Sequence, residues 1–255
     1  MTTSLTTDAH LDVVAARVDV MASVAARTDP GTVVPTCPQW VLRDLVVHQG
    51  GVHRWATAHV VGAADIDSAP MFVAPEGADQ LAAWLRRGAD ELLTALRSAP
   101  DDLNAVRFLK DAPAPRAFWA RRQAHEMTIH SVDAQSAELG RTIAAHESGI
   151  AHEVAVDGLD ELVAGFVPRG STRLRHHEPV RISIAPTDSD VGYTVDVSSE
   201  PPFTRSGIDT DADLTVRGTA RQLYLGLWNR GDEIDVSGRT ELLDAWRRQM
   251  RIRWS

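Results

Sequence analysis

The sequence predicts an α+β protein, with a bundle of four helices over residues 1–142 followed by a smaller domain of strands and helices over residues 143–255. Two observations indicate this organisation. Apolar residues recur at spacings of three and four over residues 10–139, which is the period of amphipathic helices. Beyond about residue 180 the pattern changes to alternation and β-branched runs, which are typical of strands.

The first two helices are expected at residues 10–27 and from Pro38 to about Gly62. The run Asp29-Pro30-Gly31 between them is a turn signal. Pro38 is expected at the first helical position, where the backbone N–H that proline lacks would have no partner within the helix. The apolar stripe of the first helix consists of Leu11, Val14, Val18, Met21 and Val24.

The third and fourth helices are expected at residues 76–98 and 115–139. Pro100 follows the third helix, and Gly140 follows the fourth at a position that favours a left-handed residue. Four amphipathic helices with short interruptions predict an antiparallel bundle.

The second half begins with an expected helix over residues 144–167, ended by Pro168. Thr219 and Gln222 form a capping-box pattern before a short helix, and Gly231 is placed just beyond its end. The stretch around residues 173–178 is the most linker-like in the chain. Strands are expected at residues 180–184, 193–197 and 214–216.

Composition limits the possible functions. The 255 residues are 44% hydrophobic and 24% charged, which is the balance of a soluble globular protein. A net charge of −9 disfavours binding to nucleic acid or to an anionic membrane surface. Neither a long apolar run nor a leader-like start is present, so we expect a cytoplasmic protein. Cys37 is the only cysteine, so any metal ligands must be histidines and carboxylates.

The expected fourth helix carries a pair of metal-binding residue types. Glu126 and His130 are four residues apart and therefore share one helix face, flanked by Arg122 and Asp133. His125 points elsewhere. It is five residues from His130, which excludes a zincin motif because the two histidines of that motif are four apart.

A third ligand is expected from the second helix. His48 lies on an apolar stripe that faces the bundle core, and His53 lies on a second, mostly apolar stripe about 140° away. Spacing alone does not choose between them. Two histidines and one carboxylate leave coordination positions open, as in catalytic metal sites. The alternative is a hydrogen-bonded core histidine with an exposed Glu126–His130 pair.

Three other histidine pairs are weaker candidates for metal binding. Adjacent residues on a helix face different ways, which makes adjacent His-Glu pairs poor chelators. These pairs are His146-Glu147, His152-Glu153 and His176-His177.

Two runs together resemble one known family. The first is Thr36 to His48, continued by His53-Arg54-Trp55-Ala56, and the second is Arg122 to Ala134. They are similar to the mycothiol-dependent maleylpyruvate isomerase family. The resemblance extends to the C-terminal half, including the helix end Leu225-Gly226-Leu227-Trp228-Asn229-Arg230.

The resemblance implies a DinB-like bundle that binds a divalent metal, usually zinc, through His48, Glu126 and His130. It also implies mycothiol as the thiol cosubstrate, although bacillithiol-like thiols serve other DinB-type bundles. Family members use an arginine of the C-terminal domain in catalysis, for which Arg230 is our candidate. An arginine that only interacts with its helix end is the alternative. Arg217 and Arg239 are its competitors.

Two further side chains near the expected site are interpreted as structural. Asp133 could support His130, but we favour a surface acid. Cys37 belongs to the family-like turn, and we interpret it as a packing residue, because no His or Asp near it in sequence would complete a nucleophilic site.

The function implied is a metal-dependent isomerase or S-transferase that adds a small-molecule thiol to an electrophilic substrate. The metal would stabilise the thiolate form of the thiol. We expect a monomer or a weak dimer. The alternative function is a DinB-like metal-binding or regulatory protein without catalytic activity.

Overall fold

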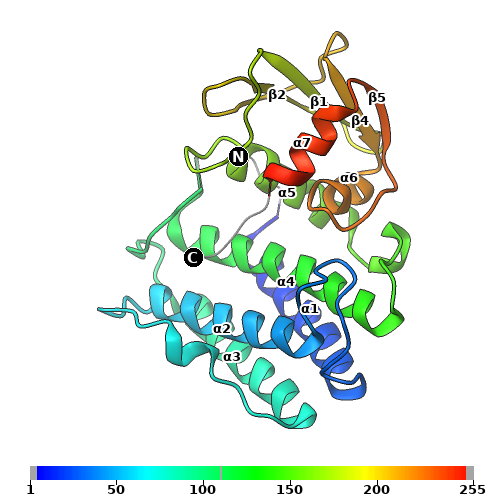
Figure 1. Cartoon of the computed structure of the whole chain (residues 1–255). Helices are drawn as coiled ribbons and strands as arrows, with labels where there is room; N and C mark the ends of the chain where they lie inside the picture. Colours follow the sequence, from blue (N-terminus) through cyan, green and yellow to red (C-terminus); the bar gives the residue numbers. More distant parts are fainter. Residues whose placement is uncertain (1–4, 110, 251–255) are drawn as a thin grey trace. The chain divides into compact units, whose positions relative to one another are not determined.

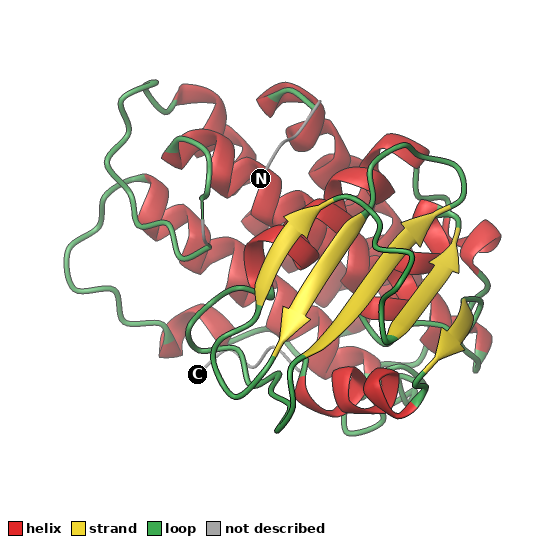
Figure 2. Cartoon of the chain, turned by 90° about the horizontal axis from the view of Figure 1, so that it is seen from above, coloured by secondary structure: helices red, strands yellow, loops and turns green. Residues whose placement is uncertain are grey.

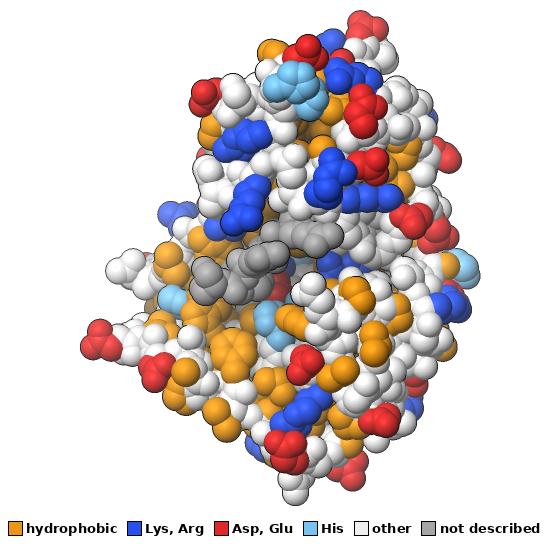
Figure 3. All heavy atoms as spheres, in the orientation of Figure 1, with side chains coloured by type: hydrophobic (Ala, Val, Ile, Leu, Met, Phe, Trp, Pro, Cys, Tyr) orange, Lys and Arg blue, Asp and Glu red, His pale blue; other side chains and the backbone are white. Residues whose placement is uncertain are grey.

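A computed structural model describes residues 5–109 and 111–250, and these fall into two compact units. The helical unit comprises Leu5–Arg107 and Pro113–Ile143, and the C-terminal unit comprises residues 144–250 with a short segment near residue 108. Acidic and basic side chains are interspersed on the face shown in Figure 3. Among the described residues, no helix is both long enough and apolar enough to cross a membrane.

The helical unit is a four-helix bundle, as predicted (Figure 1). Helix α1 packs on α3 and α4, and α2 packs on the same two helices. Leucine, valine and alanine side chains from all four helices form the core. The helices are α1 (Thr7–Arg27), α2 (Leu42–Val60), α3 (Ala78–Ser98) and α4 (Pro115–Leu139), with the short 3₁₀ helix η1 (Ala69–Phe72) after α2.

Helix α2 begins later than expected. Pro38 lies in a turn and not at the first helical position, because the Val34 N–H donates to the Trp40 carbonyl at 3.0 Å and closes a loop before the helix. The Asp44 carboxylate then accepts the Val41 N–H at 3.1 Å, so the helix starts at Leu42. The other bundle helices start within three residues of their expected positions, and Gly140 adopts the predicted left-handed conformation.

The C-terminal unit is built on a five-stranded sheet with strand order β3-β2-β1-β4-β5 (Figure 2). Strands β1 and β4 are parallel, and the other neighbours are antiparallel. Helix α6 packs on β1, β4 and α5. The strands are β1 (Val180–Pro186), β2 (Tyr193–Val197), β3 (Phe203–Ser206), β4 (Leu214–Gly218) and β5 (Asp235–Gly238), and the helices are α5 (His152–Asp160), α6 (Ala220–Leu227) and α7 (Glu241–Gln249).

The prediction of one continuous helix over residues 144–167 is wrong, because the segment is divided into three parts. Gly149 has a φ of 60°, which ends the short 3₁₀ helix η2 (Ala145–Ser148) before α5 begins. After α5 the chain continues as the π-helical segment η3 (Glu161–Phe166). The stretch at residues 173–178 lies inside the C-terminal unit.

The capping box of Thr219 and Gln222 at the start of α6 is confirmed. At the end of this helix, Asn229 adopts the left-handed conformation with a φ of 62°. The expectation that Gly231 is the residue just beyond the helix end is therefore wrong. Asparagine tolerates this conformation better than most residues.

Helices α2 and α3 approach closely at Gly50, where a Cβ atom would collide with the indole ring of Trp84. We predict that Gly50→Ala lowers the free energy of unfolding by about 1–3 kcal/mol, although alanine is the better helix former. Gly170→Ala is the control, because a Cβ at Gly170 meets no atom within 4 Å. Thermal unfolding measures both. A Gly50→Ala protein as stable as wild type would contradict this packing.

Candidate metal centre

Helices α2 and α4 bring His48, Glu126 and His130 together, with one potential ligand atom of each within 4.8 Å of the others. The Glu126 Oε1 atom lies 3.6 Å from His48 Nε2 and 3.3 Å from His130 Nε2. Atoms that bind one tetrahedral zinc ion at about 2.1 Å stand about 3.4 Å apart. The spacing of the three side chains therefore suits a single small cation.

Two atoms of this cluster lack hydrogen-bond partners. His48 Nε2 and Glu126 Oε1 are buried, and neither makes a hydrogen bond within the described part of the chain. Buried polar atoms are rarely left in this state, because an unmade hydrogen bond costs about 1–3 kcal/mol. The two atoms face each other across the cluster, so the residues fit a bound metal ion.

The Glu126 carboxylate is buried in its ionised form. Burial raises its pKa, but the imidazoles of His130 and His48 and the guanidinium of Arg122 outweigh this effect and hold the pKa well below its usual value. An Nη2 atom of Arg122 donates to Glu126 Oε2 at 2.8 Å. Arg122 thus occupies one carboxylate oxygen and leaves Oε1 for the cluster.

Asp133 is buried, and the interpretation of this residue as a surface acid is wrong. Its side chain is 0% exposed, and Oδ2 lies 3.0 Å from His130 Nδ1. Thr36 donates its hydroxyl to Oδ1 at 2.5 Å, and the Cys37 sulfur lies 3.9 Å from Oδ2. A carboxylate on Nδ1 fixes the imidazole orientation and directs Nε2 at the cluster.

The same carboxylate affects the charge of His130. Burial lowers the pKa of this imidazole, but Asp133 and Glu126 outweigh the burial and raise the pKa to about 9. Without a metal ion, His130 therefore carries a proton, and its charge together with that of Arg122 compensates the two buried carboxylates. A divalent cation would replace that proton.

Aromatic rings lie beside the cluster. The Trp40 ring centroid is 4.9 Å from that of His48 and 6.2 Å from that of His130, and Phe72 lies 6.5 Å from His48. Gly51 makes room for Phe72, because a Cβ there would collide with its ring. Our sequence reasoning missed both aromatic residues, although Trp40 falls within the family-like run.

The structure brings His48 rather than His53 to Glu126. His53 lies one turn along α2 from Gln49, and its Nε2 atom is 2.9 Å from the Gln49 amide nitrogen. An amide nitrogen can only donate, so His53 Nε2 accepts this bond and is unprotonated. His125 lies elsewhere in the bundle, with its ring 6.1 Å from that of His10.

The candidate arginines lie in the C-terminal unit. Arg230 follows α6, and its Nη1 atom donates to the Trp228 carbonyl at 2.8 Å, which is a contact typical of a helix-terminal arginine. Arg239 pairs with Glu241 at 2.9 Å, and Arg217 is exposed on β4. Among the described residues, none of the three weaker histidine pairs belongs to a group of side chains spaced to hold a metal ion.

We predict that Asp133→Asn lowers metal affinity roughly 10-fold to 100-fold, because His130 loses the charged group that orients it. Glu138→Gln is the matched control, since this acid is on the same helix but pairs with the exposed Arg27. Competition with a chromophoric chelator measures both affinities. Equal losses in the two variants would show that Asp133 has no special role.

A second prediction concerns pH. Burial is the main cause that lowers the pKa of His53, to about 3, so the folded protein resists a proton that the unfolded chain accepts near pH 6.5. The contribution of His53 to stability should therefore fall as the pH drops below 6.5, by about 2 kcal/mol at pH 5. The raised pKa of His130 adds stability over the same interval and offsets part of this loss. Urea unfolding of the metal-free protein at pH 7 and pH 5 tests this. The His53→Gln variant should lose less stability over this interval, and an identical loss would contradict the assignment.

Known proteins resemble this chain over most of its length. The model of the mycothiol maleylpyruvate isomerase N-terminal domain matches residues 11–135, and that of the MDMPI C-terminal domain matches residues 153–245. The crystal structure of the mycothiol-dependent maleylpyruvate isomerase has a TM-score of 0.62 at 13% identity, covering 93% of this chain and 96% of that one. A mutant of that enzyme, with one histidine replaced by alanine, gives 0.61 at 14% identity over the same shares.

At these identities the two structures show a shared fold. No curated protein matches the chain. The two family models together span both halves in the expected order, which confirms the resemblance inferred from the sequence. The chain belongs to the mycothiol maleylpyruvate isomerase family.

Proposed function

We propose that this protein is a metal-dependent enzyme that activates mycothiol for addition to an electrophilic substrate, as a maleylpyruvate-type cis–trans isomerase or a thiol S-transferase. The observation that carries the proposal is the pair of buried atoms His48 Nε2 and Glu126 Oε1 beside His130, neither of which makes a hydrogen bond. Family membership supports mycothiol as the thiol and an isomerase as the type of enzyme.

The proposed metal ligands are His48, Glu126 and His130. Two imidazoles and one carboxylate are a common ligand set for zinc, and three protein ligands leave a position open. A divalent cation held there would supply the positive charge that lowers the pKa of a thiol. We favour zinc because this ligand set is common for it.

The protein's own residues would keep the ligands ready. Arg122 holds Glu126 ionised, and Asp133 holds the His130 ring by its Nδ1 atom. The rings of Trp40 and Phe72 lie beside the cluster and would reduce its contact with water. A thiolate in such surroundings is less hydrated and therefore more reactive than in bulk water.

The proposed reaction needs no nucleophile from the protein, because the thiolate is the nucleophile. For a cis–trans isomerisation, the thiolate adds to one carbon of the substrate's double bond, and the electron pair moves onto the adjoining conjugated carbonyl. Rotation about the resulting single bond and expulsion of the thiolate then give the other isomer. In an S-transferase, the adduct takes up a proton and leaves as the product. We propose that Arg230 binds a substrate carboxylate through paired hydrogen bonds.

We predict that His48→Ala and Glu126→Gln each reduce bound metal to below about one tenth of the wild-type content, because each removes a ligand. His53→Gln is the matched control on the same helix and should retain the metal. Elemental analysis of dialysed protein measures this. Unchanged metal content in the first two variants would contradict the proposed ligand set.

The same samples test the activity. Wild-type protein should consume mycothiol, or isomerise a maleylpyruvate-type substrate, when mixed with a panel of electrophiles, and the two ligand variants should not. Protein that holds metal but neither turns over nor responds to mycothiol would instead be a metal-binding or regulatory module, contrary to the proposal.

The role of Arg230 gives a further prediction. Arg230→Gln should raise the KM for a carboxylate substrate about tenfold or more, because a charged, bidentate contact is lost, and metal content should not change. Arg217→Gln and Arg239→Gln should leave this KM within about twofold. A larger effect from either of those two substitutions would assign the role to that arginine instead.

A further inference from the structure

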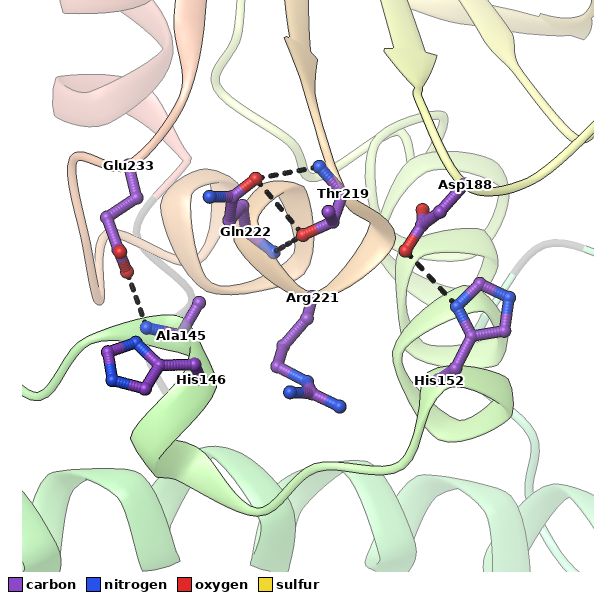
Figure 4. Close-up of a pocket in the computed structure, with 8 residues that line it drawn as sticks. All are labelled: Ala145, His146, His152, Asp188, Thr219, Arg221, Gln222 and Glu233. Carbon is purple, nitrogen blue, oxygen red and sulfur yellow. Dashed lines mark hydrogen bonds and ion pairs between the residues drawn. The ribbon is translucent and has the colours of Figure 1, made fainter.

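The C-terminal unit contains a polar cavity of about 270 Å³, which we term the Arg221 cavity (Figure 4). It lies where η2, α5 and α6 begin, and all of its lining residues belong to the C-terminal unit. Its charged and aromatic lining residues are His146, His152, Asp188, Arg221 and Glu233. The metal centre has no part in it, because His48, Glu126 and His130 belong to the helical unit.

Arg221 projects from α6 into this cavity, between His146 and His152 (Figure 4). Its Nε atom is buried and makes no hydrogen bond. The guanidinium also forms no ion pair with any acid in the described ranges, residues 5–109 and 111–250. A partly buried guanidinium without a counter-charge is unfavourable, and five N–H donors in a fixed plane suit an anion.

The two acids of the cavity are engaged elsewhere. Asp188 Oδ1 accepts the Ala220 N–H at 2.7 Å, and Oδ2 lies 3.3 Å from His152 Nδ1. Glu233 accepts the N–H of Ala145. Both carboxylates thus bind backbone amides at the starts of helices, where such contacts are favourable. This arrangement leaves the guanidinium of Arg221 available to another anion.

The start of α6 holds Arg221 in place. The Gln222 side-chain oxygen accepts from the Thr219 N–H at 2.8 Å and lies 3.1 Å from its hydroxyl, and the Gln222 N–H donates back to that hydroxyl at 3.3 Å. This capping box fixes the first turn of the helix, and Arg221 lies within that turn. A site on a rigid helix start positions its donors better than one on a loop.

We propose that the Arg221 cavity binds a small molecule through one carboxylate or phosphate group, which pairs with the Arg221 guanidinium between the two imidazoles. The cavity volume is at the lower limit for small-molecule sites, which favours a compact anion over a nucleotide. Carboxylate and phosphate share the planar, bidentate recognition that arginine provides. The proposal does not depend on the function of the metal centre.

The test uses the whole 255-residue chain with labelled histidine side chains, observed by nuclear magnetic resonance. Inorganic phosphate and succinate are titrated separately at constant ionic strength. We expect the His146 and His152 signals, assigned from single His→Gln variants, to shift with saturation for at least one anion. Saturation by phosphate alone would identify a phosphate group as the ligand, and saturation by succinate alone would identify a carboxylate.

Variants locate the binding. Arg221→Gln should bind the anion at least tenfold more weakly, and Arg221→Lys should fall between it and wild type. Lysine keeps the charge and the aliphatic stem, so this variant remains informative if the glutamine variant does not fold. Arg173→Gln is the matched control, because Arg173 is an exposed arginine of the same unit outside the cavity. No saturable shift with either anion, or equal affinities for wild type and Arg221→Gln, would overturn the proposal.

Discussion

The buried carboxylate of Glu126 is the constraint on which the rest of the candidate site depends. It is 6% exposed in a bundle whose other interior side chains are mostly apolar, and an uncompensated charge there would cost several kcal/mol. Arg122 binds one of its oxygens, and His48 and His130 face the other. The arrangement around this one charge explains why helices α2 and α4 present these polar side chains to each other.

Compensation by protons alone leaves the cluster incomplete. His130 holds a proton because Asp133 and Glu126 flank it, and its Nε2 atom forms an ion pair with Glu126 Oε1 at 3.3 Å. His48 Nε2 and Glu126 Oε1 still make no hydrogen bond. A divalent cation would satisfy both atoms and replace the proton in one step. Asp133, which accepts the Thr36 hydroxyl, would then orient the His130 ring through its Nδ1 atom. The loop before α2, which carries Thr36, thus contributes to the geometry of the site.

Local sequence signals predicted part of this structure. Both ends of helix α4 were predictable, because Pro115 and Gly140 are strong signals of a helix boundary. The true start of α2 was not, because hydrogen bonds within the preceding loop determine it and the Pro38 pattern does not reveal them. The burial of Asp133 was also not predictable. Helix α4 is buried on nearly every face, so helical spacing cannot distinguish an interior acid from an exposed one.

In the C-terminal unit the missed elements are helix α7 and two short strands. Strands β3 and β5 have four residues each, most of them exposed, and therefore carry no alternating pattern. Arg221 was missed for a different reason. It stands inside a capping-box sequence, where an arginine on the first turn of a helix is indistinguishable from a solvated one until the fold places η2 and α5 beside it.

The central claim is that the cluster of His48, Glu126 and His130 holds a metal ion with a position open to a thiol. X-ray absorption spectroscopy of the zinc-loaded protein, before and after addition of mycothiol, tests it most directly. We expect only nitrogen and oxygen neighbours before addition, and a sulfur neighbour at about 2.3 Å afterwards. A spectrum that is unchanged by saturating mycothiol, or one that contains sulfur from the start, would contradict the account.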